Sequence, residues 1–311
     1  MKTTCLLIIV LIFCQSLKAQ TVDSNYTLST PVGEVIGTLT IAQDAKEDLV
    51  IIVPGSGPTD RNGNNPMGLQ TNTYKMLSDS LYNYNIGSLR YDKKGIGESV
   101  KVAEENLIFE DYVEDLILWI KKLKKETKAK KIYLLGHSEG ALIAMLAAVR
   151  EPVGGVISVA GTALPADTLL LQQLNKQPGL YTKAKPVIEK LSRGDTAQNV
   201  PPMLISVFRP SVQPYLISWF KFDPVAVIKD LKIPILIIHG SKDIQIPQSQ
   251  AKLLSKAGGS NAQLEIIENM NHVLKTVVED DVTANMQTYS DPNKPLNHAM
   301  VKKIINFIQS K

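Results

Sequence analysis

The sequence contains little cysteine and little net charge. Its two cysteines, Cys5 and Cys14, both lie in the first twenty residues, within a segment that we expect to be removed. Without them the chain can form no disulfide, and a cysteine nucleophile or a cysteine metal site is excluded. Loss of Lys2 and Lys18 with the same segment lowers the formal net charge from +4 to +2, which gives no argument for nucleic-acid binding.

A run long enough to span a membrane is absent as well. The apolar stretch 5–14 is ten residues long, whereas a spanning helix needs about 20. It follows the charged Lys2 and leads to the small Ala19, which is the pattern of a secretory signal cleaved after Ala19. We therefore predict that residues 1–19 are a signal peptide and that the protein is exported, to the periplasm or out of the cell. A membrane anchor and a lipid attached at Cys14 are the weaker alternatives.

The rest of the sequence alternates between mostly apolar runs and amphipathic helical patterns. Such runs are typical of strands buried on both faces of a parallel sheet. They lie at 48–53, 86–92, 131–135, 154–160, 234–240 and 262–267. Helical patterns lie at 73–84, 108–124, 141–148, 248–257 and 295–310, and residues 26–42 suggest an opening hairpin. The alternation predicts an α/β fold, with a mostly parallel sheet and helices on both faces.

This alternation stops between residues 164 and 222. The section is rich in proline and contains leucine-rich helical pieces. We interpret residues 164–222 as a helical insertion over the sheet edge, and we call them the cap segment. Residues 20–163 and 223–311 are then the core around the sheet, and about 290 residues can bury such a core without disulfides or metals.

Ser138 stands in the pentapeptide Gly136-His137-Ser138-Glu139-Gly140. The predicted strand 131–135 comes directly before it and the predicted helix 141–148 directly after it. This is the Gly-x-Ser-x-Gly pattern in the strand-turn-helix setting of a nucleophile elbow, which exposes the serine hydroxyl on a sharp turn. The pentapeptide alone could arise by chance, but the setting on both sides favours a nucleophile.

Asp243 and His272 are the predicted partners of Ser138. The order serine, acid, histidine is the one that this elbow requires, and all three residues follow the ends of predicted strands. His272 would take the proton of the Ser138 hydroxyl, and Asp243 would orient the imidazole and stabilise its charge. An ordinary loop histidine and a turn-capping aspartate are the alternatives, and Asp223 and Asp280 are weaker candidates for the acid.

Catalysis at Ser138 also needs hydrogen-bond donors for an oxyanion. One predicted donor is the backbone N–H of Glu139, just after the nucleophile, and the other comes from the loop after the strand 48–53. In that loop the N–H of Ser56 is the first choice and that of Gly57 the next. Pro58 has no N–H and cannot serve.

The same loop invites a metal interpretation, since residues 60–64 alternate carboxylate and amide side chains. An EF-hand would require glycine at the sixth position and glutamate at the twelfth, where Asn65 and Thr71 stand. We therefore predict no metal, and we expect Asp60 and Arg61 to fix the shape of the loop by pairing with neighbours.

We predict no cofactor either. The glycine-containing turn 90–99 lacks the Gly-Lys-Ser/Thr ending of a phosphate-binding loop. The turn is expected to shape the end of the preceding strand.

With these residues identified, the chain resembles the α/β-hydrolase superfamily, and within it exported bacterial esterases grouped with the serine aminopeptidase-like hydrolases. The segments that carry the resemblance are 54–61, 91–97, 136–140, 213–220 and 239–243. The resemblance implies the α/β-hydrolase fold with a helical cap insertion, and carboxylic ester hydrolysis without a cofactor. The loop of the second oxyanion donor departs from many relatives, which carry histidine where this chain has Pro54.

The composition of the cap segment bears on the substrate. An aminopeptidase must bind an ammonium group and needs acidic side chains, but the segment has Asp167, Glu189 and Asp195 against seven lysines and arginines. Its leucines and aromatic residues are expected to form its own core, with a few lining an acyl pocket.

We predict a carboxylesterase for small esters with short to medium acyl groups, with neither nucleic acid nor a stable membrane anchor as a partner. A serine aminopeptidase and an acyltransferase are the alternatives. A non-catalytic binding protein would be expected to lack a member of the triad.

Overall fold

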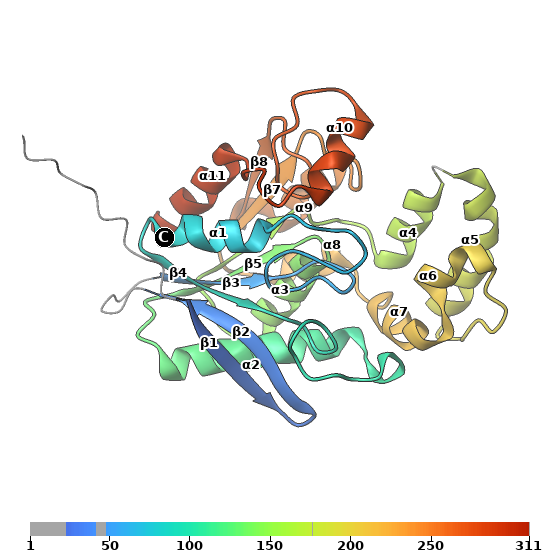
Figure 1. Ribbon diagram of the computed structural model, residues 1–311, viewed down its shortest axis with the longest axis horizontal. Helices are drawn as coiled ribbons and strands as arrows, with labels where there is room; N and C mark the ends of the chain where they lie inside the picture. The colour runs from blue at the N-terminus through green and yellow to red at the C-terminus, as the bar shows by residue number, and fades with distance from the viewer. Residues whose placement is uncertain (1–22, 42–47, 176, 311) are drawn as a thin grey trace, which may run out of the picture.

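The computed structural model describes residues 23–41, 48–175 and 177–310. The predicted signal peptide, residues 1–19, lies outside the described residues. The described chain forms one sheet of eight strands in the order β1-β2-β4-β3-β5-β6-β7-β8 (Figure 1). The strands are β1 (Asp23–Thr30), β2 (Gly33–Thr40), β3 (Asp48–Val53), β4 (Ile86–Tyr91), β5 (Ile132–His137), β6 (Gly155–Val159), β7 (Ile235–Gly240) and β8 (Ala262–Ile267).

Strands β3 to β8 are parallel, and the hairpin of β1 and β2 joins them through an antiparallel pairing of β2 with β4. The predicted mostly parallel sheet is thereby confirmed. Side chains of a strand point alternately to its two faces, so a strand covered on both faces must be apolar throughout. In β3, Leu49, Ile51 and Val53 face one core, whereas Val50 and Ile52 face the other.

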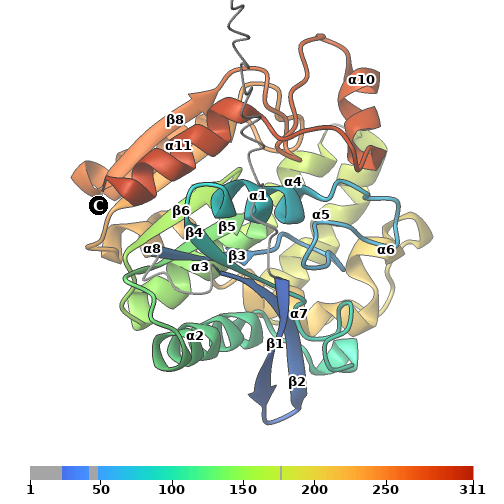
Figure 2. The same ribbon diagram turned by 60° about the vertical axis from the view of Figure 1, so that its left-hand side comes forward.

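Helices cover both faces, as the apolar strands require (Figures 1 and 2). One face carries α1 (Thr73–Tyr82) and α11 (His298–Gln309), and the other carries α2 (Phe109–Glu126), α3 (Glu139–Arg150), α8 (Pro224–Asp230) and α9 (Gln248–Gly258). No helix in the described ranges is long and apolar enough to cross a membrane.

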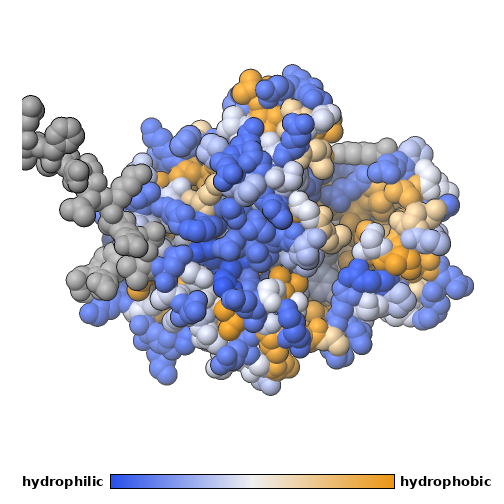
Figure 3. Space-filling view, in the orientation of Figure 1, coloured by the Kyte–Doolittle hydropathy of each residue, from blue (hydrophilic) through white to orange (hydrophobic). Residues whose placement is uncertain are grey.

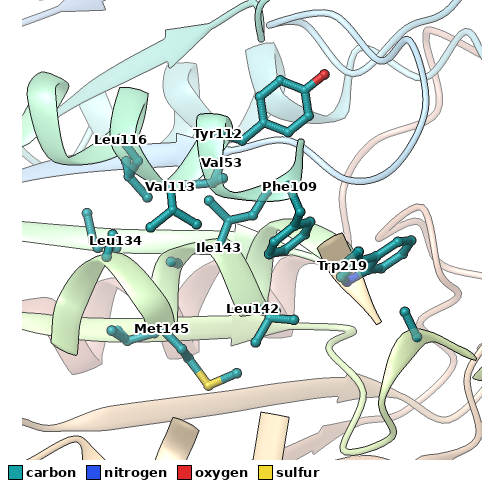
Figure 4. Packing of buried hydrophobic residues seen from close by; sticks show 14 of the residues in the cluster. Val53, Phe109, Tyr112, Val113, Leu116, Leu134, Leu142, Ile143, Met145 and Trp219 are labelled. Carbon is teal, nitrogen blue, oxygen red and sulfur yellow. The ribbon is translucent and has the colours of Figure 1, made fainter. Parts of the chain in front are cut away.

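The described part of the cap segment contains helices and no strand. Its helices are α4 (Ala166–Leu174), α5 (Pro178–Ser192), α6 (Ile205–Phe208) and α7 (Gln213–Trp219), and they lie beside one end of the sheet (Figure 1). Helix α7 packs against α2, where the rings of Phe109 and Trp219 are stacked with centroids 5.7 Å apart (Figure 4). The Phe109 N–H also donates to the Ser218 hydroxyl at 2.7 Å.

Apolar side chains gather on the surface over the cap segment, at the right of Figure 3. The exposed apolar residues of the segment include Met203, Ile205 and Val207. Single exposed apolar residues are ordinary, but this group lies on the insertion next to the carboxyl ends of the parallel strands.

Helix α3 crosses β5 and β3 so closely that two positions admit only glycine. A Cβ added at Gly136 would lie 2.1 Å from the carbonyl oxygen of Gly140, and one added at Gly140 would lie 2.4 Å from that of Val53. Both contacts are with backbone, which cannot turn away as a flexible side chain can. The two glycines therefore allow the turn between β5 and α3 to form.

We predict that Gly140→Ala lowers the free energy of unfolding by about 1–3 kcal/mol, because the methyl group overpacks the crossing. The matched control is Gly179→Ala in α5, where an added Cβ meets nothing within 4 Å. That change should be neutral or stabilising by up to about 1 kcal/mol, since alanine favours a helix. Urea unfolding of both variants measures the difference, and equal effects would contradict the close crossing.

Candidate active site

The three predicted catalytic residues all follow carboxyl ends of parallel strands. Ser138 comes directly after β5, Asp243 lies in the turn after β7, and His272 lies in the loop after β8. His137 links two of these places, because its Nε2–H donates to the carbonyl of His272 at 2.8 Å and the two rings lie 5.0 Å apart. The structure therefore brings Ser138, His272 and Asp243 to one edge of the sheet.

The backbone of Ser138 has an unfavourable conformation. Its φ is +55° and its ψ is −119°, in a region that residues with a side chain rarely occupy. The Ser138 N–H donates to the carbonyl of Val159 at 2.9 Å, and its carbonyl accepts from the N–H of Ala141 at 3.0 Å. These bonds hold a turn that leaves the serine partly exposed at the start of α3. The Ser138 hydroxyl makes no hydrogen bond with another described residue.

Asp243 and His272 are joined by a hydrogen bond. His272 Nδ1–H donates to Asp243 Oδ2 at 2.8 Å, while Asp243 Oδ1 accepts from the N–H groups of Gln245 and Ile246 at 2.8 and 2.9 Å. Burial tends to raise the pKa of Asp243, but His272 and the N–H of Ile246 hold that pKa below its usual value. Asp243 is thus an ionised acceptor, and Nε2 of His272 remains as the basic nitrogen.

His239 lies in β7, as the sequence indicated, and its ring is close to the carboxylate of Asp243. Its Nε2 lies 2.8 Å from the carbonyl of Ile246 and 3.6 Å from Asp243 Oδ2. Burial lowers the pKa of His239, so its ring is neutral and donates Nε2–H to Ile246. The ring helps to fix the turn that carries Asp243.

His137 is a site residue that sequence reasoning missed. The Gly55 N–H donates to the Tyr74 hydroxyl at 3.0 Å, and this hydroxyl donates to His137 Nδ1 at 2.8 Å. His137 Nε2–H then reaches the His272 carbonyl. Burial, together with the nearby His272 ring, lowers the pKa of His137 to about 3, so the ring is neutral with its proton on Nε2. This chain of hydrogen bonds connects the loop after β3, the elbow and the loop of His272.

The predicted oxyanion donors lie on two segments that meet at the elbow. Gly55 is packed against the serine, since a Cβ added to it would lie 3.4 Å from Ser138 Cβ. Ser56 and Gly57 follow it and are exposed. The N–H groups of Ser56, Gly57 and Glu139 have no acceptor among the described residues. Within the described chain, these three N–H groups are therefore not used by another hydrogen bond.

Lys93 forms a buried ion pair beside these donors. Its Nζ lies 3.0 Å from Glu139 Oε1, and both side chains are at most 2% exposed. The same Nζ donates to the Gly55 carbonyl at 2.8 Å. The sequence indicated only that the turn 90–99 shapes a strand end, so the role of Lys93 was missed.

The pairing predicted for Asp60 and Arg61 is confirmed. Arg61 Nη1 lies 2.7 Å from Asp92 Oδ2, and Asp60 Oδ1 accepts from the N–H groups of Asn62 and Asn64. Within the described ranges, no three His, Cys, Asp or Glu side chains are grouped as metal ligands. The loop is held by its own hydrogen bonds and by the ion pair of Arg61 with Asp92.

The segment after His272 forms a short helix, α10 (Val282–Gln287), that the sequence pattern did not predict. Asn271, next to His272, donates to Asn285 Oδ1 and Thr288 Oγ1 at 3.1 and 2.7 Å. Thr73 of α1 donates to the Val273 carbonyl at 3.0 Å. The loop of His272 is therefore anchored on both sides.

Comparison with known proteins finds similarity to hydrolases in part of the sequence and in the fold. Residues 67–203 match the family described as serine aminopeptidase, S33. The match includes Ser138 and ends before Asp243 and His272. Esterase EstD of Thermotoga maritima is 29% identical over 236 residues, which cover 72% of this chain and 54% of EstD. The chain thus spans about half the length of this curated relative.

Solved structures share the arrangement of strands and helices. Pyrococcus furiosus esterase Pf2001 is similar with a TM-score of 0.62 at 14% identity, over 93% of this chain and 91% of that one. Est1E from Butyrivibrio proteoclasticus is similar with a TM-score of 0.60 at 18% identity, over 92% and 99%. These likenesses concern the fold, and together with the family match they confirm the resemblance expected from the motifs.

We predict that acid destabilises the protein through His137. The folded pKa of about 3 lies below the usual value of about 6.5, so only the unfolded chain binds this proton between those values. The free energy of unfolding should fall as pH drops through that window, by about 2 kcal/mol from this group at pH 5 relative to pH 7.5. His137→Gln removes this ionisation. Urea unfolding at the two pH values should therefore show that the variant loses about 2 kcal/mol less free energy of unfolding between pH 7.5 and pH 5 than the unchanged protein does. Equal losses in both proteins would contradict the assignment.

Proposed function

We propose that this chain, which has the α/β-hydrolase fold and resembles the serine aminopeptidase-like hydrolases, is a serine esterase that cleaves carboxylic esters. The observation that carries the proposal is the bond between His272 Nδ1 and Asp243, at the same sheet edge as the strained turn of Ser138. A serine hydroxyl is a weak nucleophile until an oriented base removes its proton.

The proposed reaction has two steps on one serine. His272 Nε2 takes the proton from Ser138 Oγ as the oxygen attacks the ester carbonyl, and returns it to the leaving alcohol. Asp243 keeps the proton on Nδ1 and stabilises the imidazolium. The N–H groups of Glu139 and Ser56 bind the oxyanion of the tetrahedral intermediate. Water then attacks the acyl-enzyme by the same route and releases the acid.

The ionic contacts of the site favour an ester over an aminopeptidase substrate. A free substrate ammonium needs an unpaired carboxylate, and among the described residues the two acids of the site are engaged. Glu139 is ion-paired with Lys93, and Asp243 accepts from His272. In the cap segment, Glu189 and Asp195 lie 3.9 and 3.8 Å from Lys185 and Arg193. Asp167 accepts hydrogen bonds from Ser192 and Thr168. We therefore place a serine aminopeptidase second.

The acyl group is proposed to be short or medium in length and to contact the cap segment. This segment carries exposed apolar side chains such as Ile205 and Val207, and it packs on α2 through Phe109 and Trp219. Apolar surface with a few oriented polar groups is the usual character of a small-molecule site. An acyltransferase would use the same acyl-enzyme, and product analysis with an added alcohol acceptor separates the two outcomes.

We predict that Ser138→Ala and His272→Ala each lower kcat on p-nitrophenyl butyrate by at least about 10⁴-fold, because each removes a member of a unit that acts together. The matched control is His298→Ala, which changes an exposed histidine at the start of α11. This control should keep the kcat of the unchanged protein. Full turnover in Ser138→Ala, with its fold verified by circular dichroism, would refute the mechanism.

A second prediction concerns the substrate class. The protein should hydrolyse p-nitrophenyl acetate and butyrate, and it should hydrolyse aminoacyl anilides at least about 100-fold more slowly, because the two acids of the described site, Glu139 and Asp243, already have partners and do not receive the ammonium group. Steady-state kinetics on both series gives the ratio of kcat/KM. Turnover of the anilides alone would establish the aminopeptidase in place of the esterase.

A further inference from the structure

Lys93 is a buried cation that the proposed mechanism leaves unused. It follows β4 (Ile86–Tyr91), and its side chain is 2% exposed. Its Nζ meets the Gly55 carbonyl at 2.8 Å, Glu139 Oε1 at 3.0 Å and the face of the Tyr112 ring at 4.7 Å from the centroid. An ammonium has three N–H donors, and these three partners account for them. Lys93 therefore has a defined position between the loop after β3 and the elbow.

The bond to Gly55 has a consequence for the neighbouring N–H. The carbonyl of Gly55 and the N–H of Ser56 belong to one planar trans peptide, so they point in opposite directions. By holding the carbonyl, Lys93 turns the Ser56 N–H away from itself. The other side of Gly55 is fixed independently, because its N–H donates to the Tyr74 hydroxyl at 3.0 Å. The peptide that carries the proposed donor cannot rotate without breaking the bond to Lys93.

The bond to Glu139 acts on the other proposed donor. Glu139 is the first residue of α3 and carries a buried carboxylate. Its own backbone N–H is the proposed donor to the oxyanion. An unpaired carboxylate there would repel a developing negative charge, and an adjacent cation cancels that repulsion. The Lys93 ammonium thus acts on both proposed donors, the N–H of Ser56 and the N–H of Glu139.

We propose that Lys93 is a positioning residue for the oxyanion hole: it orients the Ser56 N–H through the Gly55 carbonyl and neutralises Glu139 next to the second donor. The inference rests on the proposed function, since it presumes a tetrahedral intermediate on Ser138. Lys93 contacts neither the substrate nor the reacting atoms. Its contribution therefore belongs to the transition state and not to the binding of the ester.

The test compares two double variants of the full protein, each of which removes both charges of one buried ion pair. Lys93→Met alone leaves Glu139 buried and unpaired, which strongly destabilises a protein. The double variant Lys93→Met/Glu139→Gln avoids this charge, and it loses the bond that orients Gly55 together with the contact on the Tyr112 ring. The matched control is Lys94→Met/Asp115→Asn, which removes the adjacent buried ion pair of 2.8 Å that has no contact with Gly55.

Two readouts separate positioning from a structural role. The double variant at Lys93 should lower kcat on p-nitrophenyl butyrate by about 10- to 100-fold with KM unchanged, less than the 10²- to 10³-fold loss when a donor is removed outright. The affinity for trifluoroacetone, which forms a tetrahedral adduct on a nucleophilic serine, should fall by the same factor. The control pair should change neither quantity. Its melting temperature shows how much stability is lost when a buried ion pair alone is removed.

The outcomes are distinguishable from those for the esterase proposal. If the double variant at Lys93 keeps kcat and the ketone affinity within about twofold, or if the control pair loses as much, Lys93 is only structural and the inference is wrong. If the unchanged protein binds the ketone through Ser138 but turns over no ester, the esterase proposal fails. The effect of Lys93 on ketone affinity is still measured in that case.

Discussion

The hydrogen bonds on the two sides of Gly55 hold the proposed site together. On one side its N–H is held by Tyr74, which also donates to His137, and His137 in turn donates to the His272 carbonyl. On the other side its carbonyl is held by Lys93, which pairs with Glu139. Loops after β3, β4, β5 and β8 therefore share one buried network. Since a buried polar group without a partner costs about 1–3 kcal/mol, each member depends on the others.

The same network explains how the turn of Ser138 persists. A serine at φ +55° is unfavourable by itself, by about 1–3 kcal/mol. The residues before and after it are both held by side-chain contacts, His137 by two hydrogen bonds and Glu139 by an ion pair. The close crossing of α3 over β5 and β3, which only Gly136 and Gly140 permit, packs the backbone on both sides of the turn. Strain at the serine is thus sustained by packing and polar contacts around it.

The fold was largely predictable because its signals are local. Continuous apolar runs indicated the parallel strands, and their bounds agree with β3 to β8 within a few residues. The chain order of strand ends also indicated that Ser138, Asp243 and His272 would come to one edge. His137 and Lys93 were not predictable, because their partners His272 and Glu139 are 135 and 46 residues away. Helix α10 has no apolar repeat of its own and is held by Asn285, which accepts from Asn271. Such contacts follow from the tertiary arrangement and leave no periodic pattern in the sequence.

The central claim is that Ser138 carries the acyl group between the two steps. Rapid acid quenching of the protein during turnover of p-nitrophenyl butyrate, followed by peptide mass spectrometry, tests it directly. The account predicts a butyryl group on the peptide that contains Ser138, assigned to that residue by fragmentation. A butyryl group on a different residue, with Ser138 unmodified while the ester is consumed, would contradict it.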